Sequence, residues 1–194
     1  HVNIFYVLAI VLDLKIVINC VLMFATPSRK LTLILKLLFD ILCVCQLLCI
    51  YFYNGTRGVF ASMGLNVICI FSDIIFYLRT DHKWADSRTW LYIFVAIIPA
   101  SLLFTYDSWI SLLPVFGSMI ITVALYLINQ KYTKILTLIG QVLYILHFSL
   151  LLKDSDFITV LNLTASCTMF VSCFIGLVIM LVKEHKSKQI SNEK

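Results

Sequence analysis

The chain has 194 residues, of which 61% are hydrophobic and only 13% are charged, and its mean hydropathy is +1.00. A soluble domain of this size carries roughly twice that fraction of charged residues, so the composition argues against a water-soluble helical core. The net charge of +5 requires no nucleic-acid partner, because the basic residues lie mainly between and after the apolar runs.

Seven apolar runs follow one another along the chain, and each is about 20 residues long, enough to cross roughly 30 Å of hydrocarbon. Lipid offers the backbone no hydrogen-bond partners, and the alternation typical of a membrane β-barrel is absent, so the runs predict helices. We expect an all-α integral membrane protein with one transmembrane domain over residues 1–182 and a basic tail over 183–194. The predicted spans are 4–24, 31–53, 58–78, 90–106, 109–129, 134–152 and 157–182.

Lysine and arginine are distributed unequally between the two ends of these spans. Eleven of them fall at one end, and only Arg57 and Lys153 fall at the other. Short cytoplasmic loops are rich in lysine and arginine, so we expect the N-terminus outside and the C-terminal tail in the cytoplasm. The tail is then placed where it can touch anionic lipid.

The number of spans also predicts an internal repeat. The first three and the last three spans share one orientation if the fourth inverts the chain, which is the arrangement of parallel three-helix repeats. We therefore expect a 3+1+3 plan, with repeats over 4–78 and 109–182 and a linker helix over 90–106. Similar short segments support it, since KLTLI (30–34) opens the second span and KILTLI (134–139) opens the sixth.

Polar side chains share one face of several predicted helices. In the third span, Ser62, Asn66, Cys69 and Asp73 are spaced by four, three and four residues, which places them on one helical face. Polar groups that face lipid are costly, so these faces predict either hydrogen bonds between helices or a water-filled cavity. Comparable faces are formed by Asn162, Ser166, Met169 and Cys173, by Ser111, Pro114, Ser118 and Thr122, and by Thr137, Gln141 and Tyr144.

A central cavity would place amides and hydroxyls where they can bind a solute. An amide offers two donors and two acceptor lone pairs, which suits a hydroxyl-rich or amide-bearing molecule. Seven cysteines lie within the spans without a CxxC pair, so neither a metal nor a cofactor is expected. The candidate substrate-binding residues are Asn66, Asn162, Ser62, Ser166, Gln141 and Thr122.

Ionisable residues within the spans are further candidates, because charges are rare inside a membrane. Asp73 could bind a proton, pair with a basic residue of the second span or anchor a helix contact. Lys36 and Asp40 are four residues apart, a spacing that permits an ion pair. His147 could titrate near neutral pH or act as a hydrogen-bonding residue within the bundle.

Proline and glycine in the fifth span mark a position where a helix can bend. Pro114 and Gly117 lie less than one turn apart in LLPVFGSM (112–119). Proline frees a carbonyl and permits a bend, so this segment predicts either a hinge or a fixed kink.

Three segments resemble the bacterial inner-membrane protein family named after YgjV. They are the segment 54–90, which contains Asn66 and Arg79, the Leu-Pro-x-x-Gly spacing in 109–125, and the segment 139–152. The resemblance spans roughly 29–176 and implies a location in the bacterial inner (plasma) membrane. Ser72 stands where the family often has arginine, and KDSD (153–156) replaces a glycine-rich turn.

The 3+1+3 plan is also similar, at a greater distance, to that of the SWEET sugar transporters and PnuC vitamin transporters. Their likeness implies a pocket that uses an asparagine from the third helix of each repeat, and Asn66 and Asn162 fall there. The Pro-Gln loop motif of those transporters is absent from this chain. The likeness concerns the fold and does not by itself define a function.

Two functional interpretations follow. The first is a transporter of a small polar solute, either facilitative or proton-linked, embedded in the lipid bilayer. The second is a non-transporting membrane partner, such as an immunity, sensor or scaffold protein, whose polar residues only hold helices together. An enzyme is not expected, because the HExxH and GxSxG motifs are absent and no catalytic residues are identified. The sequence leaves the oligomeric state open, a homo-oligomer included.

Overall fold

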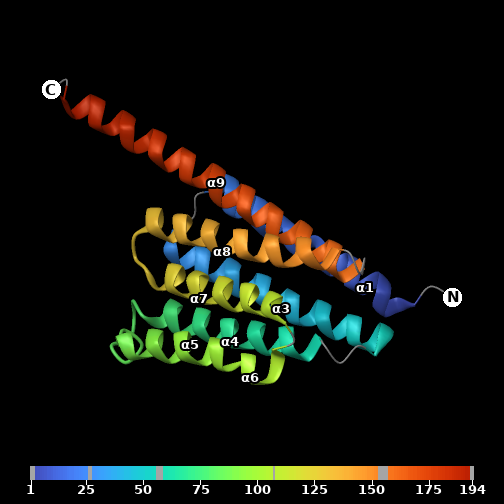
Figure 1. Cartoon of the computed structure of the whole chain (residues 1–194). Coiled ribbons are helices and arrows are strands. Elements are labelled where there is room, and N and C mark those ends of the chain that lie inside the picture. Colours follow the sequence, from blue (N-terminus) through green and yellow to red (C-terminus); the bar gives the residue numbers. More distant parts are fainter. Residues whose placement is uncertain (1–2, 26–27, 56–58, 107, 153–156, 193–194) are drawn as a thin grey trace.

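The computed structural model describes residues 3–25, 28–55, 59–106, 108–152 and 157–192. Within these ranges the chain is almost entirely helical and contains no strand (Figure 1). The prediction of an all-α membrane fold is therefore confirmed.

The helices follow the predicted spans closely. The first span is formed by α1 (Ile4–Leu12), the short 3-10 turn η1 (Asp13–Lys15) and α2 (Ile16–Ala25), and the fourth by α5 (Arg88–Ala100) and α6 (Leu102–Thr105). The last helix, α9, continues ten residues beyond the predicted end of its span, into the basic tail. The remaining elements are α3 (Arg29–Asn54), α4 (Val59–Leu78), η2 (Trp109–Ser111), α7 (Leu112–Tyr126), α8 (Gln130–Leu151) and α9 (Phe157–Asn192).

Local capping fixes several helix ends. Oγ of Ser28 accepts a hydrogen bond from the backbone at the start of α3, and Ser87 and Asn129 do the same for α5 and α8. These side chains satisfy amide groups that have no partner inside the helix. At the other end of α3, Gly55 adopts a φ of +70°, a left-handed conformation that glycine tolerates well.

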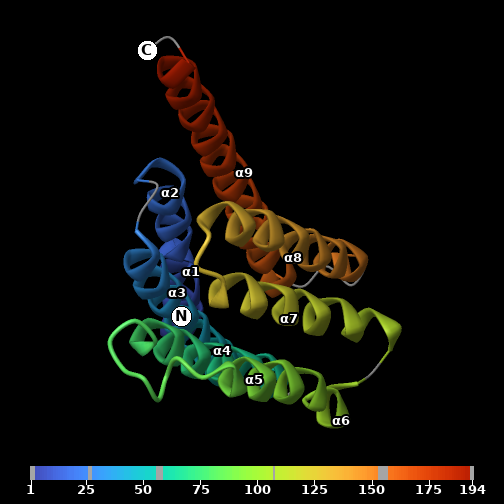
Figure 2. The ribbon, with the colours of Figure 1, turned by 90° about the vertical axis from the view of Figure 1, so that its left-hand side faces the viewer.

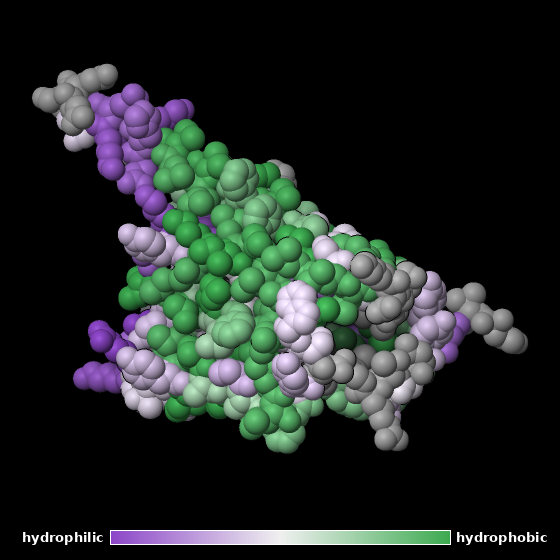
Figure 3. Space-filling model, viewed as in Figure 1, coloured by the Kyte–Doolittle hydropathy of each residue, from purple (hydrophilic) through white to green (hydrophobic). Residues whose placement is uncertain are grey.

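The outside of the bundle is apolar, as expected for a surface in contact with lipid. Six of the described helices are long and apolar enough to cross a membrane, and a shorter apolar helix covers Met63–Leu78 within α4. Leu103 and Phe104 are 84% and 91% exposed, which would be unfavourable in water. Figure 3 shows a broad hydrophobic band, with hydrophilic residues over the C-terminal part of α9 and the adjoining end of the bundle.

Six of the seven spans form a ring. The first span packs against α3 and α9, α3 packs against α4, α4 contacts α7, and α8 lies between α7 and α9 (Figure 2). The linker α5 packs outside this ring, against α4 and α7. The ring has a two-fold pattern: the first, second and third spans have the same kinds of neighbours as the fifth, sixth and seventh. This pattern is consistent with the expected pair of three-helix repeats. The described ends of the chain lie at opposite ends of the bundle (Figure 1).

Polar side chains join helices that are distant in sequence. Nδ2 of Asn19 donates to the backbone oxygen of Ala165 at 3.3 Å and to Oγ1 of Thr168 at 3.1 Å. These bonds connect the first span to α9. Hydrogen bonds of this kind hold membrane helices together where the hydrophobic effect contributes little.

Candidate solute-binding cavity

A cavity of about 190 Å³ lies at the centre of the ring. Its wall is built by η1, α3, α4, α7, α8 and α9, whereas none of its lining residues comes from α5 or α6. The volume exceeds that of an apolar cavity of about 150 Å³ that holds benzene, so a small organic molecule fits. The polar lining residues are Lys15, Lys36, Asp40, Gln46, Asn66, Ser118, Gln141, Tyr144, His147, Asn162 and Ser166.

Most of the predicted substrate-binding residues lie in this wall. Asn66 comes from α4, Gln141 from α8, and both Asn162 and Ser166 from α9. The two asparagines therefore reach the same cavity from the two halves of the chain. Thr122 is buried but is not a lining residue, and the side chain of Ser62 lies outside the described part of the structure.

One wall of the cavity carries buried charges. The ammonium group of Lys36 forms an ion pair with the carboxylate of Asp40, one turn later on α3. Asp73 is only 1% exposed and lies behind this wall, where it interacts electrostatically with both residues. The three side chains thus form a cluster of two acidic groups and one basic group.

Lys15, a charged residue of the first predicted span that is absent from the candidate site residues, lies in the cavity wall. Its Nζ donates to Oε1 of Gln46, whose Nε2 donates in turn to the backbone oxygen of Ala9 at 2.9 Å. The same ammonium nitrogen lies 5.6 Å from the centre of the Phe39 ring, a favourable position for a cation. A lysine within an apolar run is itself a signal of function, and that signal alone could have identified it.

His147 compensates for the missing amide proton of Pro114. A helix would pair the backbone oxygen of Ile110 with the amide of residue 114, but proline has no N–H to donate. Nδ1 of His147 lies 3.0 Å from the Ile110 oxygen, and since a carbonyl only accepts, this nitrogen carries the proton. The ring therefore joins α8 to the turn before α7.

Pro114 and Gly117 occupy positions that are compatible with a rigid α7. Pro114 lies in the first turn of α7, where proline is tolerated because an amide there has no hydrogen-bond partner within the same helix. The acceptor that such an amide would use belongs to the preceding turn, η2. Gly117 faces Gly140 of α8, and a Cβ on Gly117 would lie 3.1 Å from the Gly140 oxygen. Gly117 thus permits a close helix contact. The hinge remains a prediction.

A second cavity of about 40 Å³ adjoins the first. Both cavities are lined by Lys36, Ile121, Gln141 and Met169, so these four side chains form the layer between them. The smaller cavity also reaches residues in the first turns of α3 and α8, at the basic end of the bundle. The two cavities therefore lie in series.

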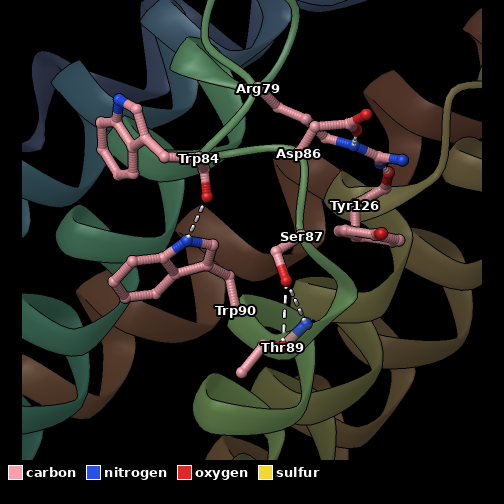
Figure 4. A network of polar contacts seen from close by, with 7 residues as sticks. All are labelled: Arg79, Trp84, Asp86, Ser87, Thr89, Trp90 and Tyr126. Carbon is pink, nitrogen blue, oxygen red and sulfur yellow. Dashed lines mark hydrogen bonds and ion pairs between the residues drawn. The ribbon is translucent and has the colours of Figure 1, made fainter.

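The connection after α4 is fixed to the end of α7 (Figure 4). Nε of Arg79 donates to Oδ1 of Asp86 at 2.8 Å, and Nη1 donates to the backbone oxygen of Tyr126 at 2.6 Å. The guanidinium carbon lies 3.9 Å from the centre of the Tyr126 ring. Nε1 of Trp90, in the first turn of α5, donates to the Trp84 oxygen at 3.0 Å, so the loop is also joined to α5. Arg79 thereby satisfies a carbonyl that the helix end leaves open.

A helical bundle with an apolar exterior and a polar interior cavity defines an α-helical integral membrane protein. The chain belongs to the Imp-YgjV family, described as bacterial inner membrane protein, whose family model matches residues 7–177. This match confirms the family resemblance seen in the sequence and supports a location in the bacterial inner membrane. No curated protein and no solved structure matches the chain.

Proposed function

We propose that this protein transports a small polar solute across the bacterial inner membrane through its central cavity. The observation that carries the proposal is the gathering of Asn66, Gln141 and Asn162 around one cavity within the ring of helices. Polar residues used only to join helices would not need to surround a space of about 190 Å³. The arrangement supports binding by hydrogen bonds to a sugar-like or vitamin-like molecule.

The serial arrangement of the two cavities supports a route for the solute. The smaller cavity lies between the central one and the basic end of the bundle, and four side chains form the layer between them. Movement of that layer would connect the central cavity to the cytoplasmic side that the basic residues predict. The proposal includes no catalytic step.

Uptake into proteoliposomes tests the transport function. Purified protein is reconstituted and exposed to a panel of labelled sugars, vitamins and small organic acids, with empty vesicles as the reference. We expect uptake of at least one solute, and a loss of about tenfold or more for Asn66→Ala and Asn162→Ala, since each removes hydrogen bonds to the solute. Ser149→Ala, an exposed change on α8, is the matched control.

A non-transporting membrane partner is the second candidate function. It is favoured by polar residues that do join helices, such as Asn19 and the hydrogen-bonded pair of Ser118 and Tyr144. In that case Asn66→Ala and Asn162→Ala would lower the thermal stability, no solute would exceed the empty-vesicle rate, and a stoichiometric partner would co-purify.

A further inference from the structure

Lys15 places a buried positive charge on the wall of the central cavity. The side chain is 2% exposed, and its ammonium group donates to Oε1 of Gln46, which is an uncharged acceptor. Lys15 forms no ion pair with any residue in the described ranges. A desolvated ammonium group that forms no ion pair is costly inside a membrane, so a negative charge brought by a ligand would stabilise it.

Neither Asp40 nor Asp13 forms an ion pair with Lys15. Asp40 lines the cavity but is paired with Lys36. Asp13 interacts electrostatically with Lys15 but is not a lining residue, and Gln46 contacts both, with its Nε2 3.5 Å from Oδ1 of Asp13. The charged residues of the described wall are therefore two lysines and one aspartate, and Lys15 is the one among them that forms no ion pair.

The rest of the wall sets the size and polarity of the ligand. The volume of about 190 Å³ is slightly larger than the cavity of about 150 Å³ that holds benzene. Elsewhere in the wall, α8 and α9 contribute the neutral polar groups of Gln141, Asn162 and Ser166. A molecule that suits this cavity has about the size of a substituted benzene ring, one negative charge and an uncharged polar remainder.

We propose that the solute of this protein is a small monocarboxylate and that Lys15 binds its carboxylate group. This inference rests on the proposed function, because it identifies the solute class of the same cavity. It distinguishes the protein from a carrier of neutral sugars, for which a buried lysine without a carboxylate partner would be unfavourable. The charge-assisted hydrogen bond from Lys15 would supply the selectivity for an acid over its amide.

Matched acids and amides test this proposal, because each pair has the same size and differs in charge. The probes are benzoate and benzamide, nicotinate and nicotinamide, and lactate and lactamide. Binding to the full chain in nanodiscs is measured by calorimetry and by the rise in melting temperature that a ligand of the folded state causes. The variants are Lys15→Gln and Lys15→Arg. Lys30→Gln is the matched control, because Lys30 pairs with Asp81 at the rim of the bundle.

We expect at least one acid to bind the wild type and Lys30→Gln more tightly than its amide does. In Lys15→Gln the affinity for that acid should fall by about 10- to 100-fold, so that acid and amide bind alike. Lys15→Arg should retain the preference for the acid. Because each variant is judged by the ratio between acid and amide, a general loss of stability cannot imitate this result.

Four results would overturn the proposal. If the amides bind as tightly as the acids, or if Lys15→Gln retains the preference for acids, the carboxylate assignment is wrong while solute binding stands. If none of the six probes binds but the uptake assay finds a neutral solute that depends on Asn66, only the carboxylate assignment fails. If neither assay finds a solute, the proposed function fails as well.

Discussion

Lys36 interacts with two acidic side chains, so the loss of Lys36 should differ from the loss of either acid. It forms an ion pair with Asp40, and Asp73 interacts electrostatically with both. Removing one partner of a buried ion pair leaves an uncompensated charge, and this is far more destabilising than the net contribution of the intact pair. We therefore expect the loss of Lys36 to destabilise the protein more than the loss of either acidic residue.

Lys36→Met should therefore lower the free energy of unfolding by about 3–5 kcal/mol, because it leaves two buried carboxyl groups without an ammonium. Asp40→Asn should cost much less, since Lys36 retains Asp73 as an acidic partner. Denaturation in mixed detergent micelles measures both changes. An equal or greater loss for Asp40→Asn would show that Asp73 does not compensate.

His147 has a structural role that follows from the chemistry of Pro114. Replacing His147 by Phe leaves the Ile110 oxygen without its donor, which should destabilise the protein by about 1–3 kcal/mol. Pro114→Ala supplies an amide proton at the position that a helix would use, so the same change should cost less in that background. A double-mutant cycle of melting temperatures measures the coupling, and purely additive effects would exclude this explanation.

At the scale of the helices, close contact between α7 and α8 depends on glycine. A Cβ on Gly140 would lie 2.6 Å from Cγ1 of Ile121 and 3.0 Å from the backbone oxygen of Gly117. Gly64 of α4 offers a comparison, because a Cβ there would meet nothing within 4 Å. Both residues lie inside helices, so their different surroundings decide the effect of a methyl group.

Gly140→Ala should lower the free energy of unfolding by about 1–3 kcal/mol, as overpacking between helices does. Gly64→Ala should leave stability unchanged or raise it by up to about 1 kcal/mol, since alanine is the better helix former. Melting temperatures of the two variants in the same detergent decide the question. A similar effect of both would indicate that α7 and α8 separate easily.

The end of an apolar run and the end of the helix that contains it need not coincide. The apolar run that forms the seventh span ends at residue 182, yet α9 continues through Asn192. Glu184 pairs with Lys188 one turn later at 3.0 Å, and such pairs support a helix in water. Hydropathy therefore marks the boundary of the hydrocarbon, whereas backbone hydrogen bonding and side-chain pairs determine where the helix stops.

At the scale of the whole molecule, the distribution of charge should determine orientation. The eleven basic residues assigned to one end contrast with two at the other, and the described ends of the chain lie at opposite ends of the bundle (Figure 1). Positive residues in short loops are retained on the cytoplasmic side during insertion. Orientation is therefore predicted by the loops, although the bundle itself would be equally stable either way in a symmetric bilayer.

Reporters fused after Lys194 test this prediction in cells. A fluorescent protein that matures only in the cytoplasm should be bright there, and an alkaline phosphatase that requires the periplasm should be inactive. The reverse pattern would place the C-terminus outside. Exchanging the basic residues of the 79–88 connection for neutral ones should reduce the preference, because it weakens the charge bias.

The sequence by itself determined the membrane-spanning helices and the inward direction of several polar side chains. Both follow from local properties, namely the length of each apolar run and the 3.6-residue period that places Asn66 beside Cys69 on one face. The tertiary structure decided which faces meet in a common cavity, how large that cavity is, and which charges are paired. Lys15 shows the reason, because its hydrogen-bond partner Gln46 lies 31 residues away in the sequence. The wall that contains Lys15 is built by helices from both halves of the chain, and no local sequence pattern specifies contacts over such distances.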